Sequence, residues 1–307
     1  MDKATAPKVF IILVNWNGWE DTVECLHSLP KLDYPNYSTI VVDNGSSDAS
    51  AEEIKSRFPS VTLIESEENR GFAGGNNLGI EYALNEGTDY VWLLNNDTVV
   101  DKDALSSLVR RMSKDANIGI CGSKLIYYHQ RDTIQVWGGG SYNRWFATTD
   151  NFGQQQPVDT PCNPRQIENN LDFVIGASML VSRRFLDEVG WLSEDYFLYY
   201  EEIDWGIRAQ PHFSLGFAPE SIVYHKEGAS TKATNRRKNN KSHLSDYYLV
   251  KNRFKLTLKF YPHLLPLMYL TTGWTIINRM RRGQWDRIPM IIKLMFTFNK
   301  ELDNINK

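Results

Sequence analysis

The chain of 307 residues carries a formal net charge of −3, and its residues are 42% hydrophobic and 23% charged. This composition excludes a fully disordered chain and fits one large domain, or one domain with an appendage. The three cysteines are widely spaced and form no CxxC pair, which argues against a disulfide framework and favours a reducing compartment. The apolar run 9–14 is too short for a signal-peptide core or a bilayer span.

Apolar runs and helical spacing alternate along the first hundred residues. A continuous apolar run, such as 9–14, is typical of a strand that is buried on both faces. Strands are predicted at 9–14, 39–42, 61–64 and 90–94, and helices at 20–29, 50–58 and 76–84. This alternation predicts an α/β fold, with a mostly parallel sheet flanked by helices.

The rest of the chain is less regular. We predict a helix at 102–112, a strand at 118–122, an irregular insertion or hairpin region at 127–170, ordered segments at 173–181 and 185–189, a polar loop at 226–243 and an amphipathic helix at 244–260. The uncharged run 264–277 is shorter than the roughly 20 apolar residues that a membrane span needs.

Charge is distributed unevenly. Residues 226–287 contain 14 Lys and Arg against 3 acidic residues, whereas the remaining chain has 20 basic and 34 acidic residues. A segment this basic favours an anionic partner, such as a phosphate, a nucleic acid or an anionic membrane. The alternative is a solvated helix face, and the sequence leaves both interpretations open.

Polar clusters follow three of the predicted strands, at 15–18, 43–48 and 95–97. In parallel sheets, ligands bind beyond the carboxyl ends of the strands. Each cluster alone is explained by turn chemistry, because Asn, Asp, Gly and Ser are the usual turn residues. Three clusters at one edge of the sheet favour a binding site.

The carboxylate of Asp97 stands at the mouth of the predicted strand 90–94. Mg²⁺ and Mn²⁺ favour oxygen ligands and usually share them with substrate phosphates. Asn95 and Asn96 are then candidates to bind the substrate or to orient metal-bound water. The alternative is that Asp97 or Thr98 caps the helix that follows.

A glycine-rich segment, 69–77, precedes a predicted helix. Backbone amides at a helix start favour phosphate, and Arg70 can add a bidentate contact. The glycines at 71, 74 and 75 do not match the GxGxxG fingerprint of dinucleotide-binding folds.

Three carboxylates, Glu201, Glu202 and Asp204, lie close together between aromatic residues. Apolar surroundings and neighbouring negative charge raise the pKa of a carboxyl group, which suits a general base. The alternative is the acidic first turn of a helix, stabilised by the helix dipole. His225 ends an apolar run, where it is either a metal ligand or a surface residue.

Taken in order, these motifs resemble family 2 glycosyltransferases with the GT-A fold, particularly the bacterial rhamnosyltransferase-like branch. The resemblance covers about residues 8–232. It rests on residues 14–18 (VNWNG), 42–48 (VDNGSSD), 69–77 (NRGFAGGNN), 94–97 (LNND), 176–180 (GASML), 200–204 (YEEID) and 225–231 (HKEGAST).

The resemblance implies an inverting, metal-dependent hexosyltransferase and assigns roles to residues. Asn15 and Asp43 are expected to contact the nucleoside, and Arg70 and Asn77 the ribose and phosphates. The predicted nucleotide-sugar site comprises Asn15, Asn17, Asp43, Arg70, Gly75, Asn77, Asn95 and Asn96. Asp97 and His225 are the predicted ligands of Mg²⁺ or Mn²⁺, and acceptor contacts are predicted at Trp137, Gly176, Tyr199 and Trp205.

Two departures from the family pattern matter. Asn95 stands where the Asp-x-Asp metal motif usually has a carboxylate, so metal binding is expected to depend more on the donor diphosphate. Glu202 stands where the family usually has Asp, which makes it the expected base by position. The longer side chain leaves Glu201 and Asp204 as alternatives.

We predict a GT-A catalytic domain at 1–243, with a nucleotide-binding half at about 8–100 and an acceptor half at about 101–243, followed by a basic amphipathic helical extension at 244–307. The expected donor is dTDP-rhamnose, with UDP-hexoses next. The expected acceptor is a hydroxyl of a glycan or lipid-linked saccharide in cell-surface polysaccharide synthesis.

The basic extension is expected to contact an anionic membrane surface or the acceptor, or to form a homodimer, and no nucleic-acid partner is expected because no recognition motif is present. The expected location is cytoplasmic and peripheral on the inner face of the plasma membrane. The alternative functions are a sugar-phosphate nucleotidyltransferase, which needs a glycine-rich basic loop after the first strand, and a non-catalytic nucleotide-sugar-binding module.

Overall fold

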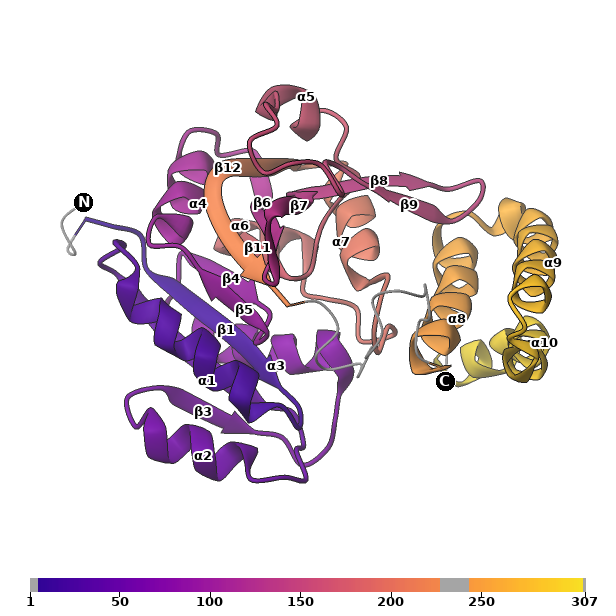
Figure 1. The fold of residues 1–307 in the computed structure, drawn as a ribbon, viewed down its shortest axis with the longest axis horizontal. Coiled ribbons are helices and arrows are strands. Elements are labelled where there is room, and N and C mark those ends of the chain that lie inside the picture. Colours follow the sequence, from indigo (N-terminus) through magenta and orange to yellow (C-terminus); the bar gives the residue numbers. More distant parts are fainter. Residues whose placement is uncertain (1–4, 227–242, 306–307) are drawn as a thin grey trace. The chain divides into compact units, whose positions relative to one another are not determined.

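The computed structural model describes residues 5–226 and 243–305, which form two compact units (Figure 1). The described part of the first unit comprises residues 5–141, 150–197 and 201–226. The second comprises 142–149, 198–200 and 243–305. Two short segments that precede residue 243 therefore group with the C-terminal helices. The predicted loop at 226–243 lies almost wholly outside the described residues.

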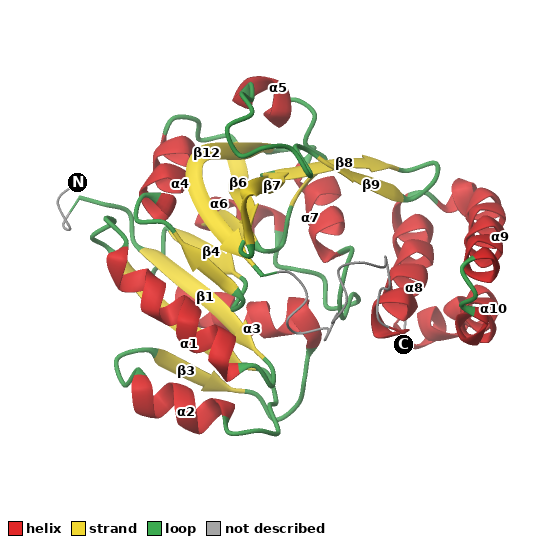
Figure 2. Cartoon of the chain, viewed as in Figure 1, coloured by secondary structure: helices red, strands yellow, loops and turns green. Residues whose placement is uncertain are grey.

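A mixed sheet forms the centre of the first unit, and Figure 2 shows helices on both of its faces. Among the described residues, the sheet has nine strands in the order β3-β2-β1-β4-β11-β6-β12-β5, with β7 paired to β6. The elements of its first half are β1 (Val9–Asn15), α1 (Trp19–Ser28), η1 (Leu29–Lys31), β2 (Tyr37–Asp43), α2 (Ser50–Arg57), β3 (Thr62–Glu65), α3 (Gly71–Asn85), β4 (Tyr90–Leu94), β5 (Thr98–Val100) and α4 (Ala104–Ser113).

The strands β1 to β4 are parallel neighbours, as the alternation of strands and helices predicts. Their side chains are apolar on both faces because helices cover both: the core on one face includes Cys25 of α1 and Leu105 of α4. The other face packs against Ala73 and Ile80 of α3. The register pairs Asn15 with Asp43, which puts both polar strand ends at one edge.

The second half of the unit adds antiparallel pairs to the sheet. β11 runs antiparallel to both β4 and β6, and β12 runs parallel to β6. The insertion or hairpin region predicted at 127–170 contains β7, the β8–β9 hairpin and the short helix α5. The elements are β6 (Ile118–Tyr127), β7 (Gln130–Trp137), β8 (Gly139–Asn143), β9 (Thr148–Asn151), α5 (Pro164–Glu168), β10 (Phe173–Val174), β11 (Ser178–Ser182), α6 (Arg183–Val189), α7 (Glu201–Ala209) and β12 (Ser214–His225).

Three helices, α8 (His243–Phe260), α9 (Leu265–Arg281) and α10 (Ile288–Ile305), make up most of the second unit, with the single turns η2 (Pro262–Leu264) and η3 (Trp285–Arg287) between them. Their shared core contains Phe254, Met268 and Ile291, together with Ala147 from the tip of the β8–β9 hairpin. The helix predicted at 244–260 is confirmed as α8, but its buried residues include the polar Asp246, Asn252 and Thr257, so the expected amphipathic character is weak. Within the described ranges, none of the helices combines the length and the apolar character that crossing a bilayer requires.

Two local predictions are corrected by the structure. The helix expected at 76–84 begins at Gly71, so the glycine-rich segment forms its first turns. A Cβ at Gly75 would lie 2.8 Å from the Val14 side chain, which shows that glycine lets α3 approach β1 closely. Helix α4 is preceded by Asp103 as its N-cap residue, so Asp97 and Thr98 do not cap it.

All three cysteines are free thiols, and Cys25 and Cys121 are buried. Burial raises the pKa of Cys25 to about 12 and also raises the pKa of Cys121.

Candidate active site

Polar residues at the carboxyl edge of the sheet form one hydrogen-bonded chain across neighbouring strands. The Asn15 side chain, fully buried, donates to Asp43 Oδ1 over 2.8 Å. Thr22 of α1 donates to Asn15 Oδ1 over 2.7 Å and accepts from Asn96 Nδ2 over 2.9 Å. The structure thus brings together Asn15, Asp43 and Asn96, three residues that the sequence placed in separate motifs.

The loops after β1 and β2 are tied to each other through Asn17 and Ser46. Asn17 adopts a left-handed φ of 50°, and its backbone N–H donates to Ser46 Oγ over 3.0 Å. In return, Ser47 N–H donates to Asn17 Oδ1 over 2.8 Å. Ser46 Oγ also donates to Asp43 Oδ1 over 2.6 Å. The polar clusters therefore do form turns, as the alternative interpretation held, and these turns fix the orientation of the Asp43 carboxylate.

The glycine-rich motif is joined to the same edge by Asn44. Its side-chain amide donates to Asn69 Oδ1 and to the Gly71 carbonyl, and its oxygen accepts from Arg70 N–H over 3.1 Å. Gly71 has a φ of +70°, and a Cβ there would lie 2.3 Å from the carbonyl oxygen of Phe197. The start of α3 is thereby fixed between the β2 loop and the segment before α7.

Arg70 and Asn77, predicted to contact the ribose and phosphates, both contact Glu194. Arg70 forms an ion pair with Glu194 over 2.9 Å, and both side chains are partly exposed. Asn77 is buried, and its amide donates to Glu194 Oε1 over 3.0 Å and to the Leu192 carbonyl over 2.9 Å. Ligand contacts by these residues stay a prediction.

Asp97 and His225 face each other between the ends of β4 and β12. Asp97 Oδ1 lies 3.1 Å from His225 Nε2, and both residues are buried. Asn95 Nδ2 lies 3.5 Å from the same nitrogen. Pairing of His225 with Thr98 in the β12–β5 ladder holds the histidine in this position.

Gln135 of β7 determines which nitrogen of His225 carries hydrogen in the neutral ring. Gln135 Oε1 lies 3.0 Å from Nδ1 and can only accept, so Nδ1 is the donor. In this neutral form, the lone pair of Nε2 faces the Asp97 carboxylate, whereas in the protonated ring Nε2–H donates to Asp97 Oδ1. The neutral form fits a divalent cation, and a polar partner on the remote nitrogen is usual for histidine ligands.

Within 5–226 and 243–298, no group of three or more His, Cys, Asp or Glu residues is placed to hold a metal ion. Within these ranges, Asp97 and His225 therefore form a pair and not a complete ligand set of these residue types. A cation held there needs further oxygen ligands, which Mg²⁺ and Mn²⁺ commonly take from substrate phosphates.

The acidic cluster lies in the first turn of α7, so the predicted acidic helix start is correct. Glu201 is buried, and burial raises its pKa well above the ordinary value of 4.5, with the neighbouring Glu202 charge raising it further. Its Oε2 has no hydrogen-bond partner among the described residues. Two carboxyl groups in contact favour sharing one proton, because the charge of one disfavours ionisation of the other.

Asp204 differs from these two glutamates because its oxygens are both engaged. Arg208 Nε donates to Asp204 Oδ1 over 2.6 Å, and the Tyr196 hydroxyl donates to Oδ2 over 3.3 Å. The side chain is fully buried. A carboxylate held in this way supports the fold of α7 and is poorly suited to accept a substrate proton.

The four predicted acceptor residues are dispersed. Trp205 is fully buried and donates its indole N–H to the Gly190 carbonyl over 2.9 Å, so it presents no exposed atom to a ligand. Trp137 lines a pocket of about 570 Å³ beside α5. Gly176 packs against Phe72, and Tyr199 belongs to the second unit. Acceptor contacts by Trp137, Gly176 and Tyr199 stay a prediction, whereas the burial of Trp205 makes it unsuited to one.

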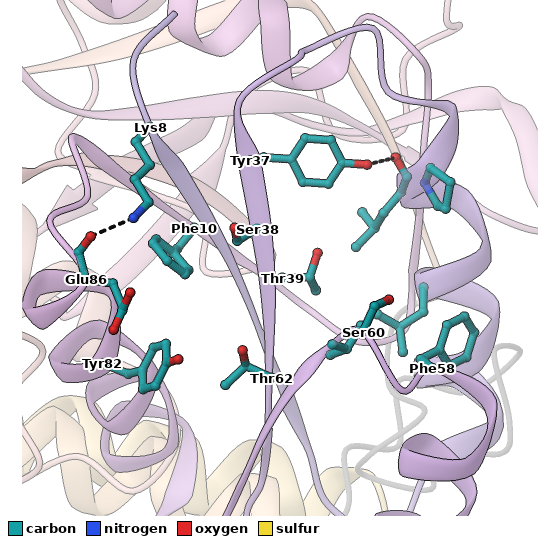
Figure 3. Close-up of a pocket in the computed structure, with 14 residues that line it drawn as sticks. Lys8, Phe10, Tyr37, Ser38, Thr39, Phe58, Ser60, Thr62, Tyr82 and Glu86 are labelled. Atoms are coloured by element: carbon teal, nitrogen blue, oxygen red, sulfur yellow. Dashed lines mark hydrogen bonds between the residues drawn. The ribbon is translucent and has the colours of Figure 1, made fainter. Parts of the chain in front are cut away.

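A second pocket, of about 470 Å³, lies at the opposite edge of the sheet (Figure 3). Lys8 and Phe10 at the start of β1, Tyr37 at the start of β2 and Thr62 at the start of β3 line it. Ligand sites in parallel sheets lie at the carboxyl ends, so this pocket is separate from the candidate active site.

Sequence reasoning missed Thr22, Ser46, Gln135 and Glu194. Thr22 and Gln135 contact predicted site residues through side-chain hydrogen bonds. Only Ser46 carried a signal in the sequence, since it lies within the polar cluster 43–48.

The fold is of the GT-A type, a mixed α/β sheet flanked by helices. Mannosyltransferase PcManGT from Pyrobaculum calidifontis, in complex with GDP-Man and Mn²⁺, has a TM-score of 0.57 at 14% identity, covering 97% of this chain and 88% of that chain. GalNAc-T7 with UDP, GalNAc and Mn²⁺ has a TM-score of 0.58 at 19% identity, covering 72% of this chain and 44% of that chain. These similarities concern the fold alone.

The sequence comparison is more specific. The profile of Glycosyl transferase family 2 matches residues 10–190, and the chain belongs to this family. The expected family and the expected GT-A fold are both confirmed.

Two further proteins are similar to this chain in sequence. The low-salt glycan biosynthesis hexosyltransferase of Haloferax volcanii is 28% identical over 204 residues, covering 65% of this chain and 61% of that protein. The N-acetylglucosaminyl-diphospho-decaprenol L-rhamnosyltransferase of Mycobacterium tuberculosis is 26% identical over 212 residues, covering 63% of this chain and 68% of that protein. The match therefore spans about three fifths of the Haloferax relative.

Proposed function

We propose that the protein is an inverting, metal-dependent glycosyltransferase that moves a sugar from a nucleotide-sugar to an acceptor hydroxyl. The observation that carries this proposal is the pairing of two features in one unit. Asp97 and His225 form a cation-suited pair at the carboxyl edge of the sheet. Glu201 and Glu202 form a separate carboxyl pair at the start of α7.

We assign donor binding to the carboxyl edge of the sheet, where hydrogen bonds fix the polar side chains. Asp43, oriented by Asn15 and Ser46, is suited to accept hydrogen bonds from a nucleoside. Asp97 and His225 would hold Mg²⁺ or Mn²⁺, and a bound cation neutralises charge on the diphosphate leaving group. Arg70, partly exposed beside its ion pair, is available to approach a phosphate.

Glu202 is proposed as the general base. Glu202 is partly exposed as a residue although its Oε2 is buried, whereas Glu201 is buried as a whole and Asp204 is engaged with Arg208. Glu202 takes the proton of the acceptor hydroxyl while the acceptor oxygen bonds to the anomeric carbon. The bond from that carbon to the diphosphate breaks in the same displacement, so the nucleoside diphosphate leaves and the configuration inverts.

The donor proposal starts with dTDP-rhamnose, because one relative is named an L-rhamnosyltransferase. UDP-hexoses come next. The proposed acceptor is a hydroxyl of a glycan or lipid-linked saccharide in cell-surface polysaccharide synthesis, since both curated relatives carry names from glycan assembly.

The test is release of nucleoside diphosphate from dTDP-rhamnose and UDP-hexoses, with and without Mn²⁺. Wild-type protein is expected to release it, and Glu202→Gln is expected to bind dTDP normally but lose turnover by roughly 10²-fold or more. Near-normal turnover in Glu202→Gln would refute the base assignment. Full activity in excess EDTA would show that the reaction needs no divalent cation. Binding of the nucleotide-sugar without any release of nucleoside diphosphate would favour a non-catalytic binding module.

For the C-terminal unit, we propose contact with an anionic membrane surface. Leu270, Trp274 and Ile277 lie at helical spacing on one exposed side of α9, and Phe296 of α10 is 73% exposed. Arg281 lies over the Trp274 ring at 5.3 Å, so cationic and aromatic groups occur together, as in interfacial helices. This contact would make the protein peripheral on the inner face of the plasma membrane.

Sedimentation with vesicles of anionic lipid at low salt tests the membrane contact. Phe296→Glu is expected to reduce binding, because the charge replaces an exposed apolar group. Protein that stays wholly in the supernatant would refute the proposal. A concentration-dependent dimer that Phe296→Glu dissociates would assign the same face to a second copy of the chain.

A further inference from the structure

Two consecutive tyrosines directly before α7 adopt left-handed backbone conformations. The φ angle is 69° at Tyr199 and 78° at Tyr200. Residues with a Cβ disfavour this region, and such strain persists only where surrounding contacts enforce it. The next residue along the chain is Glu201, the first residue of α7. The strained turn therefore directly precedes the proposed catalytic carboxyl pair.

The contacts that enforce this turn come from within the second unit. Asn252 of α8 donates from one amide nitrogen to the carbonyls of Leu198 and Tyr199, each over 2.9 Å. Asn252 is 1% exposed, so water does not replace these bonds when they are lost. The Tyr199 hydroxyl lies 3.1 Å from Ser245 Oγ, and the Tyr200 hydroxyl donates to the Ala147 carbonyl over 3.1 Å.

The chain on the other side of the turn is fixed separately. The Phe197 carbonyl accepts from Phe72 N–H over 2.8 Å, inside the first unit. Only residues 198–200 lie between that anchor and Glu201, so the backbone of this segment joins directly to the first turn of α7. Asparagine suits the position because its amide provides two N–H donors to two neighbouring carbonyls.

We propose that Asn252 is a positioning residue for the Glu201–Glu202 pair: it holds the left-handed turn at 198–200 and thereby the first turn of α7. This inference rests on the proposed function for its catalytic consequence. It gives the C-terminal helices a role in turnover in addition to any role in membrane contact.

The test compares Asn252→Ala with Val250→Ala. Val250 lies on the same helix and is 5% exposed in the core of the unit, so its truncation destabilises α8 without removing a hydrogen bond to the turn. Turnover of dTDP-rhamnose, dTDP binding and amide hydrogen exchange of residues 198–205 are measured for both variants.

Asn252→Ala is expected to lower kcat about tenfold or more, to leave KM for the donor within about twofold, and to speed exchange at 198–205. Val250→Ala is expected to lower the melting temperature while keeping kcat within about twofold. Equal losses of kcat in the two variants would reduce Asn252 to a structural residue and overturn the proposal.

A milder variant, Ser245→Ala, covers the case in which Asn252→Ala does not fold. It removes one contact of Tyr199 and is expected to change kcat and exchange in the same direction, by a smaller factor. If wild-type protein releases no nucleoside diphosphate, the proposed function fails, and exchange still decides the positioning role. Unchanged exchange at 198–205 in folded variants would overturn that role.

Discussion

Thr22 connects two motifs of the candidate site, and replacing it with valine removes both connections. The hydroxyl donates to Asn15 Oδ1 and accepts from Asn96 Nδ2, and Thr22 is fully buried. Thr22→Val removes the donor to Asn15 Oδ1 and leaves Asn96 Nδ2 with only the longer contact to the Gly18 carbonyl, at 3.5 Å. An orphaned buried polar group costs about 1–3 kcal/mol, so the expected loss is roughly 3 kcal/mol for the pair. That corresponds to a melting temperature lower by about 6 °C or more.

Thr272→Val in α9 is the matched control. Thr272 is also fully buried, but its hydroxyl has no hydrogen-bond partner within the described part of the chain. Removing an unsatisfied hydroxyl is expected to be neutral or stabilising. Urea unfolding of both variants, with dTDP binding as a second readout, measures the difference. If Thr22→Val lies within about 0.5 kcal/mol of Thr272→Val, the hydrogen-bonded chain does not hold the site together.

Three further predictions concern the cation pair, the acidic pair and the start of α3. Gln135→Leu removes the hydrogen-bond acceptor that orients His225. The Mn²⁺ concentration that gives half-maximal activity is therefore expected to rise about 10- to 100-fold. An unchanged concentration would refute the orienting role of Gln135. The pKa of Glu201 is raised in the folded state, so the folded protein keeps this proton at pH values where the unfolded chain has lost it. The stability of the wild-type protein therefore falls as pH rises above 4.5 towards the folded pKa. The melting temperature of Glu201→Gln should therefore rise relative to that of the wild-type protein from pH 5 to pH 8. A difference between the two melting temperatures that does not change with pH would contradict the raised pKa. Gly71→Ala is expected to lower the melting temperature, because its Cβ would lie 2.3 Å from the Phe197 carbonyl oxygen at a backbone φ of +70°. Thermal unfolding of the variant tests this expectation. An unchanged melting temperature would refute the close contact.

The parts of the fold that could be predicted are those where local sequence and burial agree. The run 9–14 is apolar because β1 is buried on both faces, so both the strand and its polar end at Asn15 followed from the sequence. The alternation of such strands with helices was sufficient for the parallel half of the sheet.

The start of α3 could not be predicted, because glycine disfavours helices locally. The residue at the helix start is a glycine because Phe197, far away in the sequence, leaves no room for a side chain there. Gln135 is 90 residues from His225, and Asn252 is 53 residues from Tyr199. Such contacts have no periodic signal. Asp204 and Arg208 are four residues apart on α7, so their pairing was within reach of helix-spacing rules.

The distribution of thiols makes the natural chain suitable for site-specific labelling. Cys25 and Cys121 are buried, and burial raises the pKa of both, so little nucleophilic thiolate forms near neutral pH. Cys162 is partly exposed and lines the pocket beside α5. A maleimide dye added to folded protein should therefore attach at one position. Its fluorescence would report events near α5 during donor or acceptor binding, without any cysteine substitution.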